Sequence, residues 1–147
     1  MTTNKKYKSY QTQRFLFFWL SIAVYFVPYL IATACLLPIM KVAQGTKWAI
    51  GLAVLALNAI PFLTGIFKGF RAHFPFVNMI AFVFVILAAF FLSDIFHKYV
   101  YTFLTIESVA LAGSIAACIL WHFHRKYKRK AQTVSDVLKS GLLDKEE

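Results

Sequence analysis

One carboxylate stands inside a long apolar run of this sequence and is the strongest candidate for chemistry. Glu107 follows Tyr99, where the run begins, by roughly 12 Å when each helical residue adds about 1.5 Å. A charged side chain at such depth costs about 2.5–3.5 kcal/mol on insertion scales, so the carboxyl group should face protein or water. Two interpretations stay open: a proton or cation site, or a hydrogen-bonded residue that fixes helix register.

Three uncharged polar residues fall at comparable depths in earlier apolar runs. Asn58 lies about 15 Å from the outer end of its run, near the membrane midplane. Tyr25 and Tyr29 occupy the middle and the outer middle of the first run. Because an amide and two hydroxyls could hydrogen-bond a carboxyl group across a helix bundle, we predict one ion, proton or packing site from Glu107, Asn58, Tyr25 and Tyr29.

The residue sets that catalysis, metal binding or haem ligation need are missing from the sequence. Cys35 and Cys118 fall near opposite ends of their apolar runs, too far apart for a disulfide, which needs Cα atoms within about 7 Å. His122 and His124 are two residues apart and point to different faces of a helix. We therefore expect a protein that is not an enzyme and has no catalytic residues, no cofactor and no metal site.

Length and composition place these residues in a membrane. The chain has 147 residues, of which 60% are hydrophobic and 15% charged, and its mean hydropathy is +0.65. A soluble domain has about 25% charged residues. Four apolar runs are each about 20 residues long or longer, the length that a helix needs to cross a bilayer. We predict an all-α membrane protein of four antiparallel transmembrane helices with short loops, spanning about 15–40, 48–67, 74–93 and 99–123.

Lysine and arginine residues predict the orientation and the division of the chain. Thirteen of the 16 lie in a basic N-terminal tail (1–14), in the second loop or in a C-terminal tail (124–147), on one side of the predicted bundle 15–123. Cytoplasmic segments carry such an excess, so the integral, multi-pass protein should have both termini in the cytoplasm.

The C-terminal tail combines a basic cluster with a periodic segment. The cluster should lie on anionic lipid headgroups, and we expect no binding to nucleic acid. Residues 131–143 have apolar side chains at helical spacing and predict a short amphipathic helix on the membrane surface. The predicted membrane-surface residues are Arg125, Lys126, Lys128, Arg129 and Lys130.

Small residues in the fourth run predict close helix packing, because they let a neighbouring backbone approach. Two stripes fit this spacing: Ala110, Ser114 and Ala117, or Ser108, Ala112 and Ala116. With the expected absence of catalytic residues, they favour a non-catalytic protein that acts through helix packing, as a self-associating or accessory subunit of a membrane complex. Its partners would be the bilayer and a second copy or other membrane subunits. The alternative is a small oligomeric channel, holin-like pore or transporter with Glu107 and Asn58 near the path.

Overall fold

Helices account for nearly all of the described chain. The computed structural model describes residues 3–71, 73–91 and 94–143. The helices are α1 (Thr3–Leu36), the 3-10 helix η1 (Leu37–Ile39), α2 (Gln44–Lys68), α3 (His73–Phe91), α4 (Asp94–Lys98) and α5 (Val100–Leu143). The predicted all-α class is confirmed.

Three of these helices are long and apolar enough to cross a membrane, namely α1, α2 and α5. The apolar stretch of α3, His73–Ala88, is shorter than the apolar stretches of α1, α2 and α5. The predicted span 74–93 ends at residues 92 and 93, which lie outside the described chain. A fourth crossing therefore stays a prediction.

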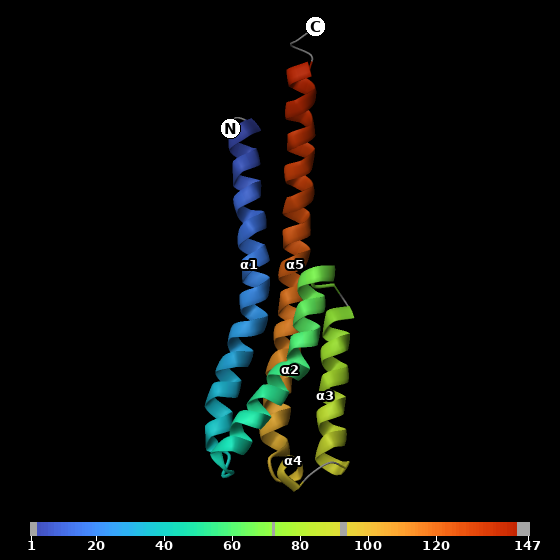
Figure 1. Ribbon diagram of the computed structural model, residues 1–147. Coiled ribbons are helices and arrows are strands. Elements are labelled where there is room, and N and C mark those ends of the chain that lie inside the picture. The colour runs from blue at the N-terminus through green and yellow to red at the C-terminus, as the bar shows by residue number, and fades with distance from the viewer. Residues whose placement is uncertain (1–2, 72, 92–93, 144–147) are drawn as a thin grey trace.

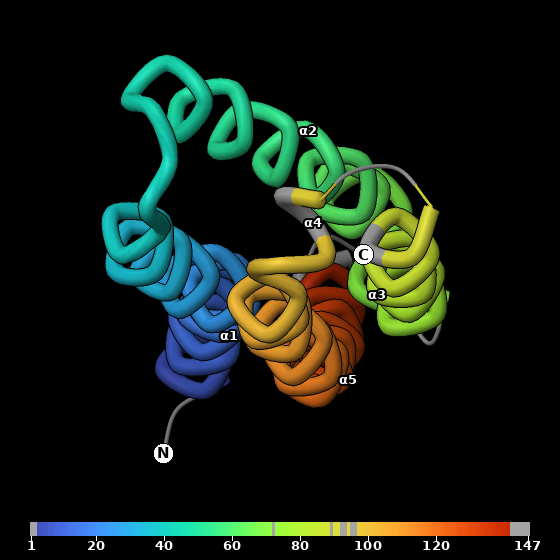
Figure 2. The backbone as a smooth tube through the Cα atoms, turned by 90° about the horizontal axis from the view of Figure 1, so that it is seen from below, coloured from blue at the N-terminus to red at the C-terminus, as the bar shows by residue number. Residues whose placement is uncertain are grey.

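Helices α1 and α5 form the central pair, and the other helices are arranged around them. The two lie side by side in both views and share the most extensive helix–helix contact of the described chain (Figures 1 and 2). Helix α2 runs obliquely from the end of α1 to the start of α3, and α3 packs against α5. The first and last described residues lie at the same end of the molecule in Figure 1.

Both predicted tails are continuations of the long helices. Helix α1 already begins at Thr3, and residues 131–143, predicted to form a separate surface helix, are the last turns of α5. The reason lies in residues 124–140, which contain neither proline nor glycine and many strong helix formers. A helix of 44 residues is about 66 Å long, twice the ~30 Å hydrocarbon thickness, so α5 extends well beyond any single crossing.

Stacked aromatic rings join α1 to α5 where the predicted spans pass into these helical extensions. The ring of Phe17 stacks on Phe123 at 5.5 Å and on Tyr127 at 5.6 Å between centroids. The Lys130 ammonium lies 5.7 Å from the centroids of both Tyr10 and Tyr127. Such contacts offset part of the repulsion between two strongly basic segments.

One small-residue stripe of α5 forms its packing face within the chain, and the other does not. Ala110, Ser114 and Ala117 are fully buried. Ser108 and Ala112 are exposed and Ala116 is half-buried, so within one chain the first of the two predicted stripes is the one that packs. Residues two apart on a helix are separated by about 200°, which places the two stripes on opposite sides.

The absence of a side chain at Gly113 lets the backbones of α1 and α5 approach closely. A Cβ atom there would lie 3.1 Å from the Val24 carbonyl oxygen and 3.2 Å from the Tyr25 Cα. Pro28 follows Val24 by four residues and has no N–H, so it cannot donate the usual helical hydrogen bond to that carbonyl. Gly113 thus packs where proline interrupts the hydrogen bonding of α1.

We expect Gly113→Leu to lower the free energy of unfolding by about 1–3 kcal/mol, the usual cost of overpacking. The obstacle is backbone, which cannot rotate away as a side chain can. Thermal unfolding in detergent measures the effect. Gly45→Leu is the matched control, because a Cβ at Gly45 meets no atom within 4 Å. Equal melting temperatures for the two variants would contradict the close α1–α5 contact.

Candidate functional site: a buried polar cluster

Polar side chains from all four long helices meet inside the molecule. Tyr25 comes from α1, Asn58 from α2, Asn78 from α3 and Glu107 from α5. Each is at most 2% exposed. These four residues are called the polar cluster below. Since apolar surroundings penalise unpaired polar groups, their convergence supplies partners that lipid cannot offer.

The shortest contact between side chains of the cluster joins α2 to α5. Asn58 Nδ2 donates a hydrogen bond to Glu107 Oε1 at 2.8 Å. The same nitrogen also donates to the Val54 carbonyl oxygen at 3.2 Å. A side-chain amide has two N–H donors, so both bonds can form at once and hold the Asn58 side chain in one orientation.

The hydroxyl group of Tyr25 connects α1 to α2 and α3. It lies 3.2 Å from Asn78 Oδ1 and 3.5 Å from Asn58 Oδ1. Because a hydroxyl has one hydrogen, it donates to one of these oxygens at a time, and the Asn78 contact is shorter. Asn78 Nδ2 donates to the Phe74 carbonyl oxygen at 3.1 Å, which orients that amide as an acceptor toward Tyr25.

Tyr29 lies beside the polar cluster. Its hydroxyl donates to the Val54 carbonyl oxygen at 2.9 Å, and it is 1% exposed. That carbonyl also accepts from Asn58, so Tyr29 is linked to Asn58 through Val54. The structure thus brings Tyr25, Asn58 and Glu107 into one network and adds Tyr29 at its edge.

Aromatic rings of α2 and α3 pack against the Tyr25 ring of the cluster. The ring of Tyr25 lies 5.0 Å from Phe74 and 5.7 Å from Phe62 between centroids. Phe74 is fully buried and contacts Phe70 edge to face at 4.9 Å. This packing excludes water from the Tyr25 hydroxyl and makes each hydrogen bond there more costly to lose.

One polar atom of the cluster has no partner in the described part of the chain. Glu107 Oε2 is buried and finds no hydrogen-bond donor among the residues that the structure describes. Carboxylate oxygens bind protons and hard cations, so this is the atom of the site at which either could be held. Within the same described residues, no group of three or more His, Cys, Asp or Glu side chains is placed to hold a metal ion.

The predicted membrane-surface residues lie on α5 beyond the predicted span 99–123. Lys126, Lys128, Arg129 and Lys130 are exposed, and Arg125 is half-buried. His124, at the start of this segment, is 7% exposed, and its Nδ1 lies 2.8 Å from the Arg14 carbonyl oxygen of α1. The basic cluster is therefore a solvated extension of the α1–α5 pair and lies apart from the polar cluster.

Asn78 is the member of the cluster that the sequence prediction missed. A signal was present, because Asn78 is the one amide in the apolar run 74–93. Amide side chains in membrane helices commonly bond across to a neighbouring helix. The partners predicted for Glu107 lie in the first two apolar runs, whereas Asn78 lies in the third.

We expect Asn58→Leu to destabilise the protein more than Glu107→Gln does. The leucine cannot donate to Glu107 Oε1, so the buried carboxyl group loses its hydrogen-bond donor. This should lower the free energy of unfolding by about 1–3 kcal/mol. A glutamine at 107 keeps an oxygen that can accept from Asn58 at nearly the same volume. Thermal unfolding in detergent, with elution size as the check on folding, tests the order. A more severe effect of Glu107→Gln would show that the carboxyl group itself is needed for stability.

The polar cluster combines a carboxyl group, two amides and a phenol in apolar surroundings. Such a set can fix helix positions by hydrogen bonding or hold a small cation or proton at one oxygen. No family model matches the chain, and no curated protein or solved structure matches it significantly.

Proposed function

We propose that the chain is a non-catalytic integral membrane protein that acts through helix packing, as a self-associating or accessory subunit of a membrane complex. The observation that carries this proposal is a free face of α5. In Figure 2, α5 lies between α1 and α3, and its remaining side faces outward. The exposed residues on that side recur at helical spacing: Tyr101, Thr105, Ser108, Ala112, Ile115 and Ile119.

The middle of this free face suits a second helix. Thr105, Ser108 and Ala112 are small, which lets another backbone approach and gain dispersion contacts. The two hydroxyls already donate to their own helix, to the carbonyl oxygens of Tyr101 at 2.7 Å and Leu104 at 2.6 Å. A partner helix therefore meets a surface whose hydroxyl groups already have hydrogen-bond partners. Small side chains in its middle allow close approach, and large side chains lie at both ends.

We expect Ala112→Leu to shift the purified protein toward smaller assemblies while leaving its fold intact. Ala112 is exposed, so the larger side chain disturbs contacts outside the chain and none within it. Elution size with light scattering in mild detergent measures the change. Ala56→Leu, at an exposed position of α2, is the matched control. An unchanged assembly size in Ala112→Leu would count against this face as the interface.

We further propose four antiparallel membrane crossings with both ends of the chain in the cytoplasm. Thirteen of the 16 basic residues fall on the side of the termini, as the charge bias of cytoplasmic segments requires. The tests use single cysteines in a chain whose Cys35 and Cys118 are replaced by alanine. An impermeant thiol reagent added to intact cells should label Lys41→Cys and leave Arg129→Cys unlabelled. The reverse pattern would overturn the orientation.

A second function, as a channel or transporter, is favoured by the unpartnered Oε2 of Glu107. In this role the carboxyl group binds a proton or cation in transit. Pro28 inside α1 and Pro61 inside α2 each remove one backbone hydrogen bond and so favour bending of these helices around the path. Vesicles containing the protein would then show proton or cation flux that Glu107→Gln abolishes. Equal flux in the original and Gln-containing proteins would leave Glu107 with a structural role alone.

A further inference from the structure

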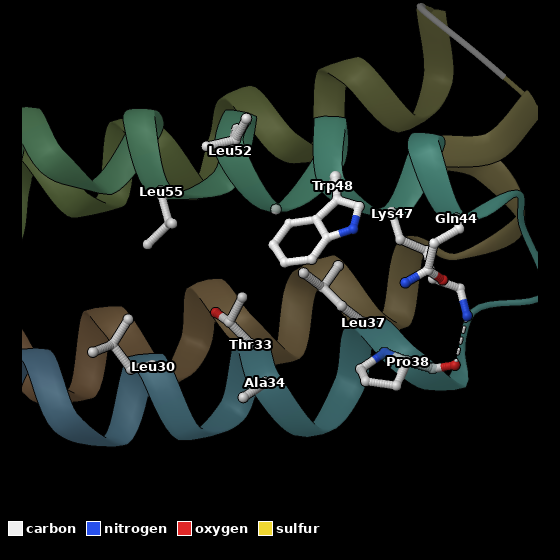
Figure 3. Close-up of a pocket in the computed structure, with 11 residues that line it drawn as sticks. Leu30, Thr33, Ala34, Leu37, Pro38, Gln44, Lys47, Trp48, Leu52 and Leu55 are labelled. Atoms are coloured by element: carbon white, nitrogen blue, oxygen red, sulfur yellow. Dashed lines mark hydrogen bonds between the residues drawn. The ribbon is translucent and has the colours of Figure 1, made fainter.

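A cleft opens between the end of α1 and the beginning of α2, on the outside of the molecule (Figure 3). Its volume is about 430 Å³, within the range of small-molecule sites. It reaches from Pro38 to Leu30 along α1 and η1, and from Gln44 to Leu55 along α2. Eight residues of helix correspond to about 12 Å, close to the depth of one leaflet's hydrocarbon. We call this feature the α1–α2 cleft.

The cleft is apolar along its length and cationic at its mouth. Its walls are mainly apolar, and the residues that line them include Leu30, Leu52 and Leu55. In Figure 3, Trp48 and Leu37 face one another across it. Lys47 lies at the end nearest the loop, where its Nζ donates to the Pro38 carbonyl oxygen at 3.0 Å. An ammonium group has three N–H donors, so this bond leaves two for another acceptor.

We propose that the α1–α2 cleft binds one acyl chain of an anionic glycerophospholipid, with the lipid phosphate at Lys47. The apolar walls match the chain, and the Lys47 ammonium matches the phosphate charge. Trp48 lies at the same end, as aromatic residues do at the level of the headgroups. Lys41 is exposed in the loop that joins η1 to α2, so this loop carries a second positive charge.

The closed inner end of the cleft favours a lipid chain over a helix of a second copy. There α1 and α2 are joined across the cleft, since the Tyr29 hydroxyl bonds the Val54 carbonyl oxygen beside Leu30 and Leu55. The proposal does not depend on self-association, because the free face of α5 and the cleft share no residue.

Native mass spectrometry of the full chain in detergent tests the site, with phosphatidylglycerol or phosphatidylcholine added. We expect one phosphatidylglycerol to be retained per chain. Ala34→Leu fills the cleft and should abolish retention, whereas Ala23→Leu, exposed on the same helix outside the cleft, should not. Lys47→Gln should weaken phosphatidylglycerol binding about fivefold and leave phosphatidylcholine unchanged. The proposal is overturned if Ala34→Leu retains phosphatidylglycerol as well as the original chain does. It is also overturned if the original chain retains both lipids equally.

Tryptophan fluorescence gives a second measurement at the same place. In a chain with Trp19→Phe and Trp121→Phe, Trp48 is the one indole left. Phosphatidylglycerol with brominated acyl chains should quench it with saturation near one lipid per chain. A chain with Trp19 alone, exposed on α1 outside the cleft, should show no saturation at that ratio. Identical quenching curves for the two chains overturn the proposal. Assembly size should be unchanged by Ala34→Leu, so a smaller assembly would assign the cleft to a second copy instead.

Discussion

The carboxyl group of Glu107 is the constraint on which the arrangement of the helices depends. Hydrocarbon cannot solvate it, so the protein must supply its partners. Asn58 donates to it directly, and Tyr25 and Asn78 extend the contact to α1 and α3. A rotation of any one of these helices would separate a polar group from its partner at a cost of about 1–3 kcal/mol. The cluster therefore specifies which face of each helix points inward.

The second constraint is the close approach of α1 and α5. Gly113 and the buried stripe of Ala110, Ser114 and Ala117 let the two backbones come together. At the ends of the predicted spans the same two helices stay together through stacked aromatic rings around Phe17 and Tyr127. With α1 on one side of α5 and α3 on another, a third side has no partner among the residues that the structure describes. That free face is the physical basis of the proposed association.

The oblique course of α2 leaves open space between α1 and α2 at the other end of the molecule. Its middle is held to the core by Asn58, while its first turns are joined to α1 through η1. The side chains between these turns and the end of α1 do not fill the space there, which leaves the α1–α2 cleft. The inclination of α2 relative to α1 thus brings the middle of α2 to the polar cluster and leaves the cleft beside its first turns.

The sequence by itself determined the helical membrane character, the buried position of Glu107 and the facing pair of Glu107 and Asn58. These follow from hydropathy and from depth, which depend on distance along the chain. Only the tertiary structure decided that Asn78 joins the cluster, that Ala110 and Ser114 pack while Ser108 and Ala112 do not, and that α5 continues to Leu143. The cleft likewise required the tertiary structure. The physical reason is that helix rotation and inclination depend on contacts between distant residues, and a single apolar run carries no record of them.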